Sequence, residues 1–460
     1  MNVLNSISTS GKFWVPGAPE DIVYGVLKIG DGGECQLEVS DSFPSCGEGN
    51  SDVELPRILG VVEDKGNVTL DQCFYVRKSL SIGSVSTSTI HVRRAICNGV
   101  FEETDVMVDS LQFSMESLEE WFGFSGFDVD HDLSGKSCSI TYNPVEEVEI
   151  ELHDNIKLFL GLQWTLPGSP NYREIKLKEK VYFDLRSPKA IKLDDLIELS
   201  GRIAVLVSFM IGKVQNIKDV VATSKSLGRV LTDGSTRPLR LELYYQSLPY
   251  VEESEPVSWH EVLLGYKAVQ DKFPSMLLNW LEFYDKSQPS IDLLITMKMK
   301  AHKYLDSEFL SLAQCLESYH RANFNNKMME EDEYISMVNL IVDSVPDEYR
   351  EFVSRKLIYG NEPNLSKRVK EVLGVYKEFI GSSKKVKSLA RNIVTTRNYL
   401  THFDDGLKES SAQGYKLWKM CRVLEDVLHL EVLRKIGVSD SEIEEIVGKS
   451  HRMKNNLAVY

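Results

Sequence analysis

Hydrophobic and polar positions alternate with the period of a β-strand through roughly the first 180 residues of the chain. Short runs rich in β-branched and aromatic residues recur there, separated by turn clusters such as GDGGE, CGEGNSD and EDKGN. This pattern is typical of an antiparallel, β-rich domain. One helix is predicted at SMESLEEWFGF, and strands are predicted in IVYGVLKI from residue 22, CQLEVS from 35, LPRILGVV from 55, CFYVRKSL from 73, STIHVRRAI from 88, SCSITYN from 137, VEIELH from 148 and EIKLKEKVYFDL from 174.

The spacing of the hydrophobic positions changes after Pro188. LDDLIELSGRIAVLVSFMIGK is long and apolar enough to form a buried helix, LRLELYYQ returns to strand alternation, and EVLLGYKAVQDKF and SMLLNWLEFYDKS show helical spacing. The longest apolar run, 203–212, is about half of the ~20 residues that a membrane-spanning helix needs, so no membrane span is expected. Residues 1–290 are therefore predicted to form an α+β domain that is β-rich with some helices.

From Ser290 onward, apolar residues recur at helical spacing almost without interruption. Short loops between amphipathic helices indicate an antiparallel bundle, so residues 291–460 are predicted to form an all-α domain. The predicted helices lie in SIDLLITMKMKAHKYLDSEFLSLAQCLESYHRANF, MEEDEYISMVNLIVDSV, LSKRVKEVLGVYKEFI, SSKKVKSLARNIVTTRNYLTHFDDG, YKLWKMCRVLEDVLHLEVLRKIG and DSEIEEIVGKS.

Charge divides the chain into an acidic front and a neutral back. Residues 301–460 hold 24 Lys and Arg against 24 Asp and Glu, so the first 300 residues carry the entire net charge of −15. Within the neutral part, residues 355–400 contain eleven bases, among them Arg368, and only three acids. Such a density is expected where phosphates are held, although a run of charge on a helix is also typical of a solvated face.

Several other classes of site are disfavoured. The seven cysteines form no CxxC pair and are interpreted as reduced, mostly buried thiols. Asp128, Asp130 and Asp132 have the spacing of a calcium loop, but Leu133 stands where that loop needs glycine and Ser139 where it needs glutamate, so a polar turn is predicted. The polar start MNVLNSISTSGKFW argues against secretion. A cytoplasmic protein without a metal or another cofactor is therefore expected.

The segment RNYLTH, residues 397–402, ends the amphipathic helix of SSKKVKSLARNIVTTRNYLTHFDDG. At about 100° per residue, one side of this helix carries the apolar positions that should face the bundle, which are Val386, Leu389, Ile393, Leu400 and, less centrally, Phe403. The opposite side carries a basic stripe about 27 Å long at 1.5 Å per residue, formed by Lys384, Lys387, Arg391, Thr395, Asn398 and His402. Arg397 lies at the edge of the apolar side, from which its side chain could reach either His402 or a partner helix.

RNYLTH resembles the signature of HEPN ribonucleases, which is an arginine, a polar residue, three variable positions and a histidine. The segment FLSLAQCLESYHRANF is similar to the opening helix of the ApeA-type HEPN domain, and FWVP at 13–16 with the β-rich region after it resembles the N-terminal domain of ApeA anti-phage proteins. The resemblance implies metal-independent cleavage of RNA, with tRNA as a candidate substrate, which would halt translation in an infected cell.

The same resemblance implies the roles of the motif residues. His402 would be the general acid or base, Arg397 would stabilise charge on the reacting phosphate, and Asn398 would orient the histidine or the phosphate. Lys384, Lys387, Arg391 and Thr395 would bind RNA. One histidine cannot readily supply both acid and base, so a homodimer that joins two motifs is expected. We further expect the acidic N-terminal domain to restrain the nuclease until a phage-derived protein releases it. The alternative is a non-catalytic HEPN-type module that only binds RNA or dimerises.

Overall fold

The computed structural model describes residues 1–3, 5–43, 54–79, 86–103, 105–165, 175–300 and 303–458. The chain forms two compact units, Met1–Pro274 and Ser275–Tyr460. The division falls within helix α4 (Phe273–Lys298), whereas the sequence pattern had suggested a boundary at 290/291.

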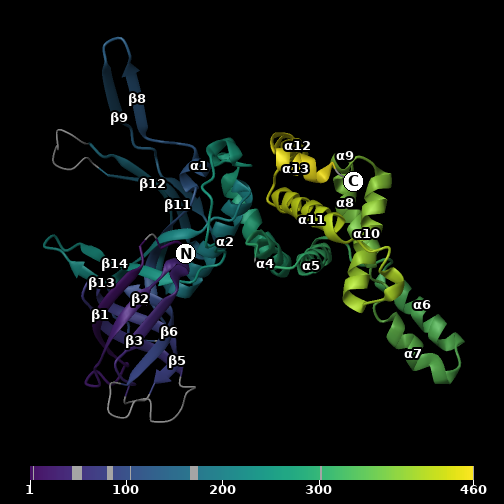
Figure 1. The fold of residues 1–460 in the computed structure, drawn as a ribbon, viewed down its shortest axis with the longest axis horizontal. Helices are drawn as coiled ribbons and strands as arrows, with labels where there is room; N and C mark the ends of the chain where they lie inside the picture. The colour runs from purple at the N-terminus through teal and green to yellow at the C-terminus, as the bar shows by residue number, and fades with distance from the viewer. Residues whose placement is uncertain are drawn as a thin grey trace. The chain divides into compact units, whose positions relative to one another are not determined.

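Six antiparallel strands of the first unit close on one another (Figure 1). In the order of their pairing they are β1 (Ile7–Trp14), β2 (Val23–Ile29), β3 (Cys35–Val39), β6 (Thr87–Cys97), β5 (Gly66–Ser79) and β4 (Glu54–Val62), and β4 pairs again with β1. All six strands contribute side chains to a single apolar core, which includes Phe13, Leu27, Leu37, Ile58 and Ile90.

Glycine allows the closed sheet to bend where β1 and β2 meet. Gly11 of β1 lies opposite Gly25 of β2. A Cβ atom on Gly11 would lie 2.3 Å from the carbonyl oxygen of Val61, and one on Gly25 would lie 2.4 Å from that of Glu38. Side chains at these positions would force the neighbouring backbones apart.

Strand β6 also belongs to an open sheet. Its first half pairs with β3, and its second half pairs with β14 (Thr236–Tyr245). The open sheet continues through β13 (Ile217–Val230), β7 (Met107–Met115), β12 (Lys178–Lys192), β11 (Lys157–Thr165) and β10 (Val148–Glu151). The buried helix α2 (Leu193–Ile211) packs on β7, β12 and β13, as its apolar sequence predicted. Strands β8 (Phe127–Asp132) and β9 (Ser137–Tyr142) form a separate hairpin.

Some element predictions for this unit were wrong or incomplete. The predicted helix at SMESLEEWFGF is only α1 (Leu118–Phe122), because its first two residues finish β7. EVLLGYKAVQDKF contains the short helix α3 (Tyr266–Val269) and, at its last residue, the start of α4. Pro188 lies within β12, where the register shifts between Arg186 and Ile191, a position that tolerates the missing N–H. Strands β1, β7, β8, β11 and β13 were not predicted.

The second unit consists of helices, so the predicted combination of a β-rich front and an all-α back is confirmed. After α4 come α5 (Leu305–Asn323), α6 (Glu331–Ser344), α7 (Asp347–Leu357), α8 (Leu365–Val375), α9 (Lys377–Ile380), α10 (Ser383–His402), α11 (Gly414–Lys435), α12 (Asp440–Lys449) and α13 (His451–Leu457). Helix α10 packs against α8 and α5, and α11 packs against α5, α12 and α13. Helices α7 and α13 were not predicted.

Helices α6 and α7 form a hairpin that buries little of its surface. Tyr334 is the one buried residue of α6, and none of α7 is buried. The hairpin begins and ends at one place, where the backbone N–H of Met328 donates to the carbonyl of Asn361 at 2.7 Å. The Asn361 side chain also bonds both backbone groups of Met329, at 3.0 Å each.

Candidate active site on helix α10

Helix α10 begins at a conventional cap and runs without a break to His402. The side chain of Ser382 accepts a hydrogen bond from the backbone N–H of Lys385 at 3.2 Å, so Ser382 rather than Ser383 is the cap. The first turn contains no acidic residue, although negative charge is favoured at this end of a helix. Lys384 and Lys385 instead place two cations there, and Lys387 follows at the start of the second turn.

The buried face of α10 follows the predicted helical spacing, with one correction. Val386, Leu389 and Ile393 are buried, and Leu400 is half-buried. Phe403 was expected on this face but is 75% exposed. It lies after the last helical residue and has φ 52°, and its N–H closes the helix on the Tyr399 carbonyl at 2.8 Å. The left-handed turn removes Phe403 from the helical wheel.

The predicted basic stripe lies along the outer face of the same helix. Its members Lys384, Lys387, Arg391 and His402 are exposed, and Thr395 and Asn398 are half-exposed. Because α10 is continuous from Ser383 to His402, their spacing keeps them on one side. Three cations, two hydrogen-bonding side chains and a histidine therefore share a solvent-accessible surface.

The motif residues are only partly brought together in one copy of the chain. The half-buried Arg397 directs a guanidinium nitrogen, Nη1, to the side-chain oxygen of Asn398 at 3.5 Å, the long limit of a hydrogen bond. This contact turns Arg397 towards the stripe. No hydrogen bond or ion pair in the described part of the chain joins His402 to either residue. His402 is exposed at the end of α10.

Thr396 helps to position the site, and the sequence pattern did not single it out. Thr396 is fully buried, and its hydroxyl oxygen accepts the backbone N–H of Ala412 at 2.8 Å. This bond ties the last turns of α10 to the loop that follows the motif and includes the short turn Asp405–Leu407. A signal was available, because Thr396 lies about 20° from Leu389 on the helical wheel, at the edge of the apolar side.

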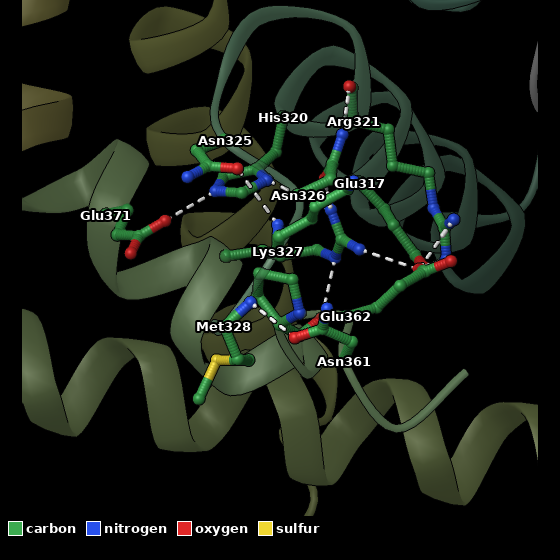
Figure 2. Close-up of polar contacts among 12 residues, drawn as sticks. Glu317, His320, Arg321, Asn325, Asn326, Lys327, Met328, Asn361, Glu362 and Glu371 are labelled. Atoms are coloured by element: carbon green, nitrogen blue, oxygen red, sulfur yellow. Dashed lines mark hydrogen bonds and ion pairs between the residues drawn. The ribbon is translucent and has the colours of Figure 1, made fainter. Parts of the chain in front are cut away.

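Arg368, counted among the bases of 355–400, does not belong to the outer surface. Its side chain is 1% exposed, and its nitrogen atoms donate to the Pro363 carbonyl at 2.9 Å, to Glu362 at 3.0 Å and to Nδ1 of His320 at 3.0 Å. Figure 2 shows the polar contacts around His320 and Glu362. The other ring nitrogen of His320 contacts Glu371 at 2.6 Å. This buried cluster joins α5 to α8, which supports α10.

The remaining candidate features of the sequence have structural roles. Asp128 and Asp130 lie in β8, and the carboxylate of Asp132 accepts the backbone N–H groups of Ser134 and Gly135 at 3.0 and 2.9 Å, which makes the predicted polar turn. Of the six cysteines in the described ranges, five are buried and Cys138 is exposed, while Cys46 lies outside those ranges. The described residues include no group of three or more potential metal ligands. None of the helices within them has both the length and the apolar character to cross a bilayer.

The helical unit agrees with a comparison to known families. The family model described as Apea-like HEPN matches residues 310–442, which include α10, its supporting helix α8 and most of α5. The model described as ApeA N-terminal domain 1 matches residues 8–280, more than half of the chain. The chain therefore belongs to the ApeA family and carries a C-terminal HEPN domain, as the sequence motifs had predicted. No curated protein and no solved structure gives a significant match to it.

Proposed function

We propose that this protein is an anti-phage endoribonuclease whose active site forms when two copies bring their α10 helices together. The observation that carries the proposal is the surface of α10, where an exposed histidine ends a stripe of exposed cations and Arg397 turns towards that stripe. An ApeA N-terminal domain followed by an Apea-like HEPN domain supports an anti-phage protein of the HEPN type.

The chemistry proposed for this surface is transfer of a phosphoryl group within RNA. The 2′-oxygen of a ribose forms a bond to the adjacent phosphorus, and the bond from phosphorus to the 5′-oxygen breaks. His402 of one copy accepts the 2′-hydroxyl proton, and the same histidine of a second copy donates a proton to the leaving oxygen. Arg397 offsets the additional negative charge on the phosphate in the transition state, and Asn398 orients the guanidinium. The products are a 2′,3′-cyclic phosphate and a 5′-hydroxyl.

A cleavage assay on total RNA in the presence of EDTA tests the proposal. The wild type should yield fragments that end in a cyclic phosphate, and His402→Ala and Arg397→Ala should not. DNA of matching sequence should remain intact, because it lacks the 2′-hydroxyl. Thr401→Ala is a matched control, since Thr401 is an exposed neighbour of His402 that lies off the stripe. Cleavage that survives in His402→Ala would contradict the proposal, and discrete tRNA fragments would identify tRNA as the substrate.

We also propose that the acidic first unit restrains the nuclease until a phage-derived protein displaces it. The net charge of −15 lies entirely in the first 300 residues, and a negative surface can compete with RNA for the basic stripe. A fragment that begins at Ser275, where the second compact unit starts, should be more active or more toxic than the full chain. A fragment that is folded by circular dichroism but inert would reject the restraint.

The alternative is a HEPN-type module that binds RNA or dimerises without cleaving it. The exposure of His402, with no hydrogen bond to Arg397 or Asn398 in the described part of the chain, is the observation that keeps this alternative open. RNA binding by the wild type without cleavage, over a range of RNA substrates, would favour it.

A further inference from the structure

A pocket lies beside the motif helix, between α10 and the start of α11. Its volume is about 290 Å³, and its lining includes Asn392 of α10, Ser410 and Ser411 of the intervening loop, and Tyr415, Lys416 and Lys419 of α11. The bond between Thr396 and Ala412 fixes this loop against α10. The pocket is thus attached to the same helix that carries the RNYLTH motif.

An exposed aromatic pair forms one side of this region. Tyr415 and Trp418 are one turn apart on α11 and are 69% and 42% exposed. Their rings stack with centroids 5.7 Å apart and planes inclined by 23°. The ammonium group of Lys419 lies over both rings, 5.7 Å from the Tyr415 centroid and 5.5 Å from that of Trp418. Trp418 and Lys419 therefore hold the Tyr415 ring at the pocket while leaving most of it accessible.

The pocket lies next to the basic stripe. Asn392 directly follows Arg391, and on the helical wheel it lies between the stripe and the buried Thr396. Asn392 and His402 are ten residues apart, which is about 15 Å along the helix axis. A single strand that follows the stripe towards His402 would thus pass the mouth of the pocket at Arg391.

We propose that this pocket binds one unpaired base of an RNA strand, stacked on Tyr415, while its phosphates contact Arg391 and the lysines of α11. This inference rests on the proposed function, because it assumes that RNA follows the α10 stripe. Aromatic rings beside cations are the combination by which proteins hold single-stranded nucleic acid. The carboxylate of Glu409 also lines the pocket and disfavours a phosphate inside it, so the uncharged base is the part that enters.

Binding is measured with full-length His402→Ala protein, so that the RNA stays intact, and a fluorescently labelled single-stranded oligoribonucleotide. Tyr415→Ala should raise Kd by about 5- to 150-fold, the range expected for the loss of one stacked base. Tyr415→Phe keeps the ring and should recover most of the lost affinity. Tyr24→Ala is the matched control, since Tyr24 of β2 is 67% exposed and lies in the other unit.

A series of oligonucleotides, each with one abasic position, tests the contact itself. At one position, removal of the base should weaken binding as much as Tyr415→Ala does, and the two losses should not add in combination. An unchanged Kd in Tyr415→Ala, losses that add at every position, or no RNA binding by the His402→Ala protein would each overturn the inference.

The outcome can be separated from that of the proposed function. Base-dependent binding through Tyr415 in a protein whose wild type never cleaves RNA would support the pocket and reject the nuclease. Cleavage by the wild type with a Kd unaffected by Tyr415→Ala would support the nuclease and reject the pocket. The second result is also expected if the exposed Tyr415 and Trp418 bind a protein partner and not RNA.

Discussion

The guanidinium of Arg368 donates a hydrogen bond to Nδ1 of His320 across 3.0 Å, and both side chains are buried. Arginine has no acceptor atom, so Nδ1 must carry a lone pair. The proton of the neutral ring then lies on Nε2, which donates to Glu371 at 2.6 Å. The geometry therefore fixes both the charge and the tautomer of His320.

The stability of the helical unit should depend on His320 at acidic pH. Burial lowers the pKa of His320 below its usual value of about 6.5. The unfolded chain therefore binds a proton near and below pH 6.5 that the folded chain does not, so this contribution to stability is complete above that pH and falls as the pH decreases. Urea unfolding followed by circular dichroism should show the loss, and His320→Gln should remove this part of the dependence. His451→Gln, at an exposed histidine, should preserve it.

Loss of Arg368 should destabilise the same unit. Arg368→Met leaves Nδ1 of His320 without its donor and Glu362 without one of its cations, and breaking such a buried cluster typically costs about 3 kcal/mol. The urea midpoint reports this change. Lys367→Met is the control, because the half-exposed Lys367 is next in sequence and should alter stability by less than about 0.5 kcal/mol. Equal effects of the two variants would contradict the role of the buried cluster.

The two serines at the start of α10 should differ in their effect on stability. Ser382→Ala removes the side-chain acceptor for the N–H of Lys385 and should cost about 1 kcal/mol. Ser383→Ala changes an exposed residue inside the helix and should cost less than about 0.5 kcal/mol. Hydrogen exchange of the amides in the first turn would locate the difference. Faster exchange in Ser383→Ala than in Ser382→Ala would refute the assignment of the cap.

The salt dependence of RNA binding should report contacts along the stripe. For a single strand, each phosphate contact contributes about −0.7 to the slope of log K against log salt. Replacing both Lys384 and Lys387 with Gln should therefore reduce the magnitude of the slope by about 1.4. Lys385→Gln should change it less, because exposed Lys385 lies about 100° from Lys384 around the helix. A larger effect at Lys385 would place the RNA on another face.

The sequence predicted the arrangement within α10 because helical spacing is a local property. It could not predict that six strands of the first unit close on one another, since the partners of β6 are set by contacts between distant segments. Strand β1 was also missed because its segment ISTSGKFW is largely polar. Arg368 was misinterpreted as a surface base, although it follows Leu365 by three residues and precedes Val372 by four, which places it on the apolar side of α8. Its partner His320 comes from another helix, which no local pattern can reveal.

The α6–α7 hairpin leaves the helical unit and returns to it through neighbouring residues, with Met328 bonded to Asn361. Almost nothing in the rest of the bundle depends on its surface. Insertions, deletions or replacement of this hairpin should therefore leave the helices that support α10 undisturbed. The same junction offers an engineering site, where a short linker or a foreign domain could replace residues 331–357 while the basic stripe of α10 keeps its supporting helices.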